Sequence, residues 1–137
     1  EIHGWFTIRE SFIDDDLSVS EYPQISHMKA INAAIADAPE FNLFCKPLIQ
    51  NGQLTLVING NFNHKDQRWS YVINLIKLIA RDAKGSYGIL HFFDDEDVDG
   101  NDNCFQAMVL KKGVVEKVVD INLSPYFPQI EEQNSES

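Results

Sequence analysis

The chain has 137 residues, of which 44% are hydrophobic, so a single domain of ordinary size can bury a core without disulfide bonds. Eleven basic against twenty-one acidic residues give a formal net charge of −10, which argues against nucleic acid or an anionic membrane as a partner. A basic protein is the partner that this charge favours, and no apolar run approaches the length of a membrane span.

The N-terminal part of the chain predicts a strand followed by a helix. Residues 2–9 alternate roughly as a strand, and Asp14, Asp15 and Asp16 then form an exposed acidic turn. Apolar residues recur at helical spacing after this turn, namely Ile25, Met28, Ile31 and Ile35. The helix is expected to start near Pro23 and to end at Pro39.

The middle of the chain predicts a hairpin and a second helix. Residues 41–49 and 54–58 are strand-like and are joined through Asn51-Gly52, a dipeptide in which both residues tolerate positive φ. Asn63 is placed to cap the second helix, and Gly85 to stop it. The apolar stripe of this helix is expected to contain Trp69, Val72, Ile73, Ile76 and Ala80.

Three further strands are expected at residues 87–93, 105–111 and 114–119, the last two joined by a tight turn at Gly113. The predicted order is therefore β-α-β-β-α-β-β-β. Hairpin connections favour an α+β fold with an antiparallel or mixed sheet and two helices packed on one face. Residues 1–130 are expected to form the single domain, and residues 131–137 a flexible acidic tail.

Cysteine and tryptophan residues are interpreted as structural. Cys45 and Cys104 lie in strand-like runs, and with no signal-peptide pattern they are expected to be reduced, buried and unpaired. Trp5 and Trp69 could anchor a partner, but a tryptophan beside a strand start or on a helix stripe more often belongs to the core.

The loop after residue 93 contains the strongest local signal in the chain. Nine residues hold six carboxylates with no basic side chain among them: Asp94, Asp95, Glu96, Asp97, Asp99 and Asp102. Like charges at this density repel one another, so the loop calls for a cation, a basic partner or simple solvation.

A calcium loop is one interpretation of this segment. Asp95, Asp97, Asp99 and Gly100 match positions one, three, five and six of the EF-hand pattern. The match fails at position twelve, where Gln106 replaces the bidentate glutamate, and the flanks are strand-like. A calcium- or metal-binding regulatory module therefore remains the alternative, and no metal ligand is assigned.

A protein interface is the favoured interpretation of the loop, against the alternative that its charges are merely solvated. Asp94 and Asp95, next to the strand end, could instead be structural by bonding loop amides, so the sharper expectation falls on Glu96, Asp97, Asp99 and Asp102. The turn at residues 14–16 is the second candidate surface.

Catalysis is not indicated. The four histidines show no ligand pair, although His3 and His91 could be neighbours if their strands pair. The serines lack a nucleophile-elbow context, and there is no phosphate-binding glycine loop. No catalytic residue and no cofactor are therefore assigned, and an enzyme ranks third among the interpretations.

Three short blocks together resemble a known family. They are His3-Gly4-Trp5 with residues 7–11, residues 93–97 with Gly100, Asn103 and Phe105, and residues 123–131 with Pro125 and Pro128. Their order and spacing across nearly the whole chain resemble the immunity protein 7 family of bacterial polymorphic toxin systems.

The resemblance implies a small cytoplasmic α+β protein that binds and neutralises a secreted toxin encoded beside it, in the producing cell or its kin. It does not identify the toxin. The acidic composition independently favours a basic target, and toxins that cut nucleic acid are commonly basic because their substrate is rich in phosphate. The expected partner is therefore a toxin domain such as a nuclease, blocked at its active site or in its access to substrate.

Overall fold

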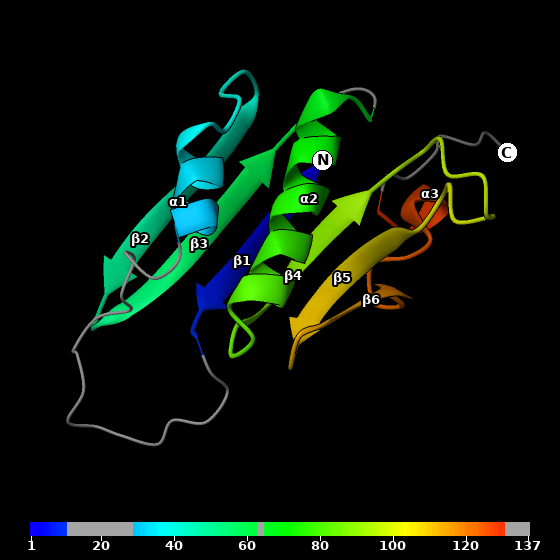
Figure 1. Cartoon of the computed structure of the whole chain (residues 1–137). Helices are drawn as coiled ribbons and strands as arrows, with labels where there is room; N and C mark the ends of the chain where they lie inside the picture. The colour runs from blue at the N-terminus through cyan, green and yellow to red at the C-terminus, as the bar shows by residue number, and fades with distance from the viewer. Residues whose placement is uncertain (11–28, 63–64, 131–137) are drawn as a thin grey trace, which may run out of the picture.

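The computed structural model describes residues 1–10, 29–62 and 65–130 of the chain (Figure 1). The elements are β1 (Ile2–Ile8), α1 (Lys29–Ala36), β2 (Leu43–Gln50), β3 (Gln53–Gly60), α2 (Gln67–Asp82), β4 (Tyr87–Phe93), β5 (Phe105–Lys111), β6 (Val114–Val119) and α3 (Tyr126–Gln129). The predicted order of strands and helices is confirmed, and the short turn α3 is an addition that the sequence did not predict. The predicted tail at residues 131–137 lies outside the described residues.

The six strands of the described chain form one antiparallel sheet in the order β2-β3-β1-β4-β5-β6. The first strand of the chain lies in the middle of the sheet, where β1 pairs with both β3 and β4. His3 and His91 lie opposite each other in this pairing, as the sequence anticipated for paired strands.

Two hairpins set the register at opposite edges of the sheet. Asn51 and Gly52 connect β2 to β3 with φ values of 51° and 75°, which confirms the predicted turn. Lys112 and Gly113 connect β5 to β6 with φ values of 52° and 76°. Both turns therefore use the positive φ values that match the twist of the flanking strands.

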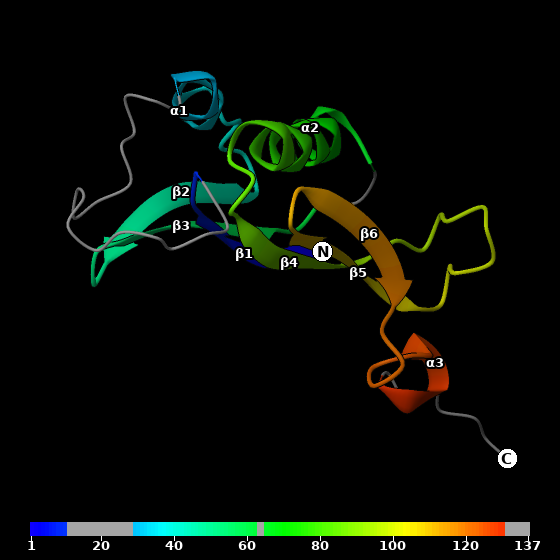
Figure 2. The same ribbon diagram turned by 60° about the horizontal axis from the view of Figure 1, so that its bottom comes forward.

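The core lies between the sheet and the two helices, which cover the same face (Figures 1 and 2). The buried side chains of α2 are Val72, Leu75, Ile76, Ile79 and Ala80. Trp69 is half-buried against this core and its ring lies 5.0 Å from that of Phe92. Ile73 is half-buried and outside the core cluster, so its predicted place in the stripe is wrong.

The ends of α2 also differ from the prediction. Asp66 is the N-cap, and its carboxylate accepts the backbone amide of Arg68 at 2.8 Å. A carboxylate there satisfies a free N–H and complements the positive end of the helix, which explains why the helix begins after Asp66 rather than at Asn63. The last helical residue is Asp82, and Ala83 is the C-cap, so the helix ends before Gly85.

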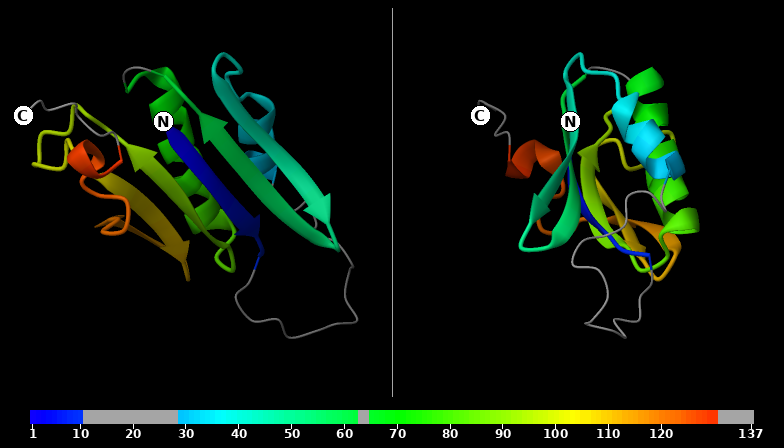
Figure 3. Two further views of the ribbon diagram at one scale, coloured as in Figure 1. Left: turned by 180° about the vertical axis from the view of Figure 1, so that it is seen from behind. Right: turned by 60° about the vertical axis from the view of Figure 1, so that its left-hand side comes forward.

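Among the described residues, the segment that covers the opposite face of the sheet lies at one end of it. The segment with α3 lies across from α1 and α2 (Figures 2 and 3), and its Tyr126 ring lies 4.6 Å from Phe93 and 5.6 Å from Phe105. We call this side of the sheet the open face. Its side chains alternate with the core residues along each strand.

Candidate protein-binding site

The acidic loop, residues 94–103, begins at a structural aspartate. Asp94 is only 9% exposed, and its carboxylate lies 2.8 Å from the ammonium group of Lys65. It also accepts the backbone amide of Glu96 at 2.9 Å, while its carbonyl accepts the amide of Asp97. Asp94 therefore shapes the start of the loop and closes it against the residues that precede α2.

Asp97 organises the middle of the loop. Its Oδ1 accepts the backbone amides of Asp99 at 2.6 Å and Asn101 at 3.3 Å, and its Oδ2 accepts the side-chain amide of Gln106 at 3.2 Å. The Asp99 amide, followed by the Gln106 side chain and the Asn101 amide, holds the pKa of Asp97 below its ordinary value. Both carboxylate oxygens are thus used within the protein, so Asp97 acts on the shape of the loop.

The remaining carboxylates of the loop point outward. Four of them are exposed: Asp95, Glu96, Asp99 and Asp102. The carboxylates of Asp95, Asp99 and Asp102 make no ion pair with any residue in the described part of the chain. The loop therefore presents a negative surface on a framework of hydrogen bonds.

The C-terminal end of the loop is joined to the last described segment of the chain. Asn103 donates from its side-chain amide to the carbonyl of Phe127 at 2.6 Å and accepts the Phe127 amide at 2.9 Å. The Tyr126 amide donates to the Asn103 carbonyl at 2.8 Å. The link from Asn103 to α3 is a structural contact that composition and periodicity did not indicate.

The open face exposes aromatic and aliphatic side chains away from α3. Trp5 is 45% exposed and meets Tyr87, which is 39% exposed, edge to face with ring centroids 6.1 Å apart. The expectation that Trp5 belongs to the core is therefore wrong. Alternation along β1 places its side chain opposite that of the buried Phe6, on the side of the sheet away from α1 and α2.

The two strand histidines are held by oxygen-bearing neighbours. His3 contacts the side chain of Asn59, and its Nε2 lies 2.9 Å from the carboxylate of Glu1. His91 donates from Nε2 to the carboxylate of Asp120 at 2.6 Å, and this bond lowers the pKa of Asp120. The two rings therefore bind different carboxylates even though their residues face each other in register.

Possible metal ligands are not grouped in the described part of the chain. Residues 1–10, 29–62 and 65–130 contain no cluster of three histidine, cysteine or acidic side chains placed to hold a metal ion. Gln106, at the twelfth position of the calcium-like pattern, is buried and bonds Asp97 instead of facing a common centre. The second candidate surface, Asp14, Asp15 and Asp16, lies outside the described residues.

Comparisons with known proteins place the chain in a family. Its sequence matches the family model of immunity protein 7 over residues 1–132. No curated protein and no solved structure matches it. Among the helices of the described residues, none has the length and apolar character needed to cross a membrane. Because the match extends over nearly the whole chain, the chain belongs to the immunity protein 7 family.

Proposed function

We propose that this protein binds a cognate toxin with a basic surface, such as a nuclease domain, and neutralises it in the cytoplasm of the producing cell or its kin. Membership of an immunity protein family supports a toxin as the partner. The observation that carries the proposal further is the acidic loop, in which inward-facing Asp94 and Asp97 hold the outward-facing carboxylates in place.

Electrostatic steering is the physical advantage of such a loop. Complementary fields raise association rates above the roughly 10⁵ to 10⁶ M⁻¹s⁻¹ of neutral protein pairs. A nuclease domain carries positive charge where it meets phosphate, so the exposed carboxylates of the loop can bind that same positive surface. Binding then covers the active site itself or stands in the path of the substrate, and both prevent contact with nucleic acid.

Charge neutralisation at two positions tests the role of the loop. The loop variant combines Asp99→Asn and Asp102→Asn, and leaves Asp97 unchanged because its oxygens shape the loop. The matched control combines Asp37→Asn and Glu40→Gln, two exposed carboxylates between α1 and β2 that give the same change in net charge. Association with the toxin domain encoded next to the gene is measured at low and high salt by surface plasmon resonance.

The loop variant should associate roughly three- to tenfold more slowly at low salt, with a weaker salt dependence, while the control stays close to the unaltered protein. Equal rates for both variants at every salt concentration would remove the loop from the interface. Absence of any binding by the unaltered protein would overturn the proposed function itself.

The metal-binding alternative is tested on the same protein. A metal ion that binds only the folded state raises the melting temperature by mass action. We expect no shift with excess Ca²⁺, Zn²⁺ or a chelator. A clear rise with one of the ions, reversed by the chelator, would instead favour a regulatory metal site.

A further inference from the structure

At the end of the open face away from α3, the register places a row of side chains across the sheet. Register places Leu48 beside Thr55, Thr55 beside Thr7, Thr7 beside Tyr87, Tyr87 beside Lys111 and Lys111 beside Val114. Leu48, Tyr87 and Val114 are 43%, 39% and 54% exposed. Trp5, in the next row, contacts Tyr87. We call the set Trp5, Leu48, Tyr87 and Val114 the open patch.

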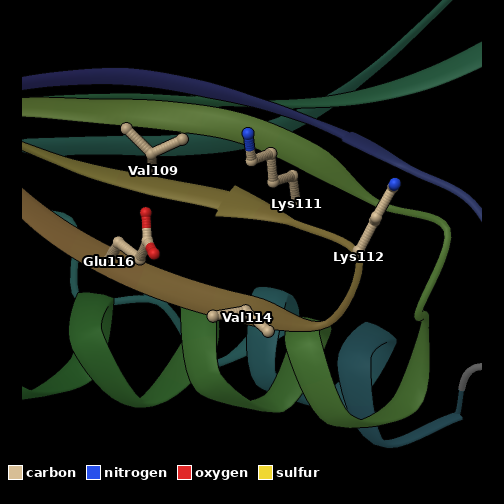
Figure 4. Close-up of a pocket in the computed structure, with 5 residues that line it drawn as sticks. All are labelled: Val109, Lys111, Lys112, Val114 and Glu116. Carbon is tan, nitrogen blue, oxygen red and sulfur yellow. The ribbon is translucent and has the colours of Figure 1, made fainter.

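Lys111, between Tyr87 and Val114 in this row, and Lys112, in the β5–β6 turn, form what we call the lysine corner. Val109, Lys111, Lys112, Val114 and Glu116 line a shallow pocket of about 210 Å³ there. In Figure 4 the side chains of Val109, Lys111 and Glu116 rise from the two strands on the side away from α2. Neither Lys111 nor Lys112 forms an ion pair with another residue that the structure describes. This corner is positive in a chain whose net charge is −10.

The α3 end of the same face indicates what kind of side chain the open-patch end can bind. There Tyr126 packs on Phe93 and Phe105, so an aromatic side chain from outside the sheet completes the surface. Apolar patches of this kind, with a charged rim, are typical of protein interaction sites, and tryptophan and tyrosine are enriched among the residues that dominate binding energy.

Tyr87 of the open patch begins β4, and the acidic loop follows the other end of this strand. The six residue steps from Tyr87 to Phe93 separate them by about 20 Å. A standard interface covers about 800 Å² on each partner and is therefore about 30 Å across. One partner can contact both regions, with basic groups at the loop and an acidic group at the lysine corner.

We infer that the cognate toxin docks on the open patch, with Trp5 and Tyr87 as apolar anchors and a toxin carboxylate at Lys111 and Lys112. The inference rests on the proposed function. It adds which surface binds the toxin and which sign of charge each end of that surface presents. Charge favours this occupant, because a second copy of the chain repels the first through its own net charge of −10. The opposite signs at the two ends also restrict the toxin to one orientation.

Two neighbouring residues of β2 provide a matched test. Leu48 belongs to the open patch, whereas Ile49 is 47% exposed and points to the opposite side of the sheet. Leu48→Asp and, independently, Val114→Asp should weaken binding of the toxin domain at least about tenfold, mainly through faster dissociation. Ile49→Asp should change the affinity less than about twofold. Circular dichroism and melting curves verify that all three variants fold.

Charge reversal tests the lysine corner. Lys111→Glu should weaken toxin binding about tenfold, because it removes one attraction and adds a repulsion. Lys77→Glu, on an exposed position of α2, makes the same change in net charge away from the open face and serves as the control. Tighter binding of the Lys111→Glu variant would contradict an acidic contact at this corner.

A spectroscopic measurement tests the surface without altering it. In a Trp69→Phe variant labelled with 5-fluorotryptophan, Trp5 gives the single fluorine signal, because the chain has two tryptophans. Addition of the unlabelled toxin domain should shift or broaden this signal. A toxin that binds but leaves both the signal and the affinities of the open-patch variants unchanged overturns the inference while the proposed function stands.

The oligomeric state tests whether a second copy of the chain, and not the toxin, occupies the open patch. Light scattering of the protein alone should give a monomer mass for the unaltered chain and for Val114→Asp. A dimer that Val114→Asp dissociates would identify a second copy as the occupant and overturn the inference. Failure of the unaltered monomer to bind the toxin at all would overturn the proposed function and the inference together.

Discussion

Gln106 donates a hydrogen bond from Nε2 to Oδ2 of Asp97 across 3.2 Å, and this bond ties the middle of the acidic loop to β5. The glutamine is 1% exposed, so its amide needs a partner inside the protein. Asp97 supplies that partner and at the same time accepts the amides of Asp99 and Asn101. Asp97 therefore orders the middle of a loop whose exposed charges repel one another.

The first prediction concerns Asp97→Asn and pH. The folded state holds the pKa of Asp97 below its ordinary value, so the ionised carboxylate stabilises the fold above the unfolded pKa of about 4. That contribution is lost as the pH falls through the folded value. Asp97→Asn should therefore lower the melting temperature at pH 7, and the difference from the unaltered protein should shrink toward pH 2.

Asp95→Asn is the control for this prediction, because Asp95 is exposed and its carboxylate makes no ion pair within the described residues. It should melt like the unaltered protein at both pH values. A difference for Asp97→Asn that is the same at pH 7 and pH 2 would mean that its ionised form contributes nothing.

The order of elements could be predicted because local signals agree with the fold. The turn at Asn51 and Gly52, the turn at Gly113 and the alternation in residues 87–93 all depend on neighbouring residues. The start of α2 was missed because Asn63 and Asp66 are both good capping residues. The structure selects Asp66, whose carboxylate also bonds the guanidinium of Arg68.

The surfaces were harder to predict, because alternation along a strand defines two faces without saying which face other elements cover. Trp5 and Phe6 are adjacent, and only the packing of α1 and α2 decides that Phe6 is buried and Trp5 exposed. In the loop, composition indicated the charge, but not that Asp97 turns inward. The inward turn of Asp97 depends on the position of Gln106 on β5, the strand that follows the loop.

The second prediction concerns the core under α2. Ile76 is 1% exposed, so Ile76→Ala should reduce the free energy of unfolding by roughly 2 to 5 kcal/mol. Ile73→Ala, on the same helix but outside the core cluster, should cost roughly 1 kcal/mol. Urea denaturation measures both. Equal losses for the two variants would place the buried side of the helix elsewhere.

The third prediction concerns the two cysteines, which are unpaired as the sequence predicted. The prediction that both thiols are buried is confirmed for Cys45, whose pKa is raised by desolvation. It is wrong for Cys104, which precedes β5 and is only half-buried. A thiol-alkylating reagent should therefore label Cys104 in the native protein and Cys45 only after denaturation. Peptide mass spectrometry identifies the labelled residue. Native labelling of Cys45 at the rate of Cys104 would contradict its burial.

The last prediction concerns the link between the acidic loop and α3. Asn103→Ala removes two side-chain hydrogen bonds with the backbone of Phe127 and should cost roughly 1 to 3 kcal/mol. Tyr126 would then hold less firmly to Phe93, so hydrogen exchange at the amides of Tyr126 and Phe127 should accelerate. Asn101→Ala is the control, because Asn101 bonds Asp97 and Cys104 through its backbone. Unchanged exchange in the Asn103 variant would mean that the Asn103 side chain is not needed, and that aromatic packing and the remaining bonds of Tyr126 and Ser124 hold the segment against the sheet.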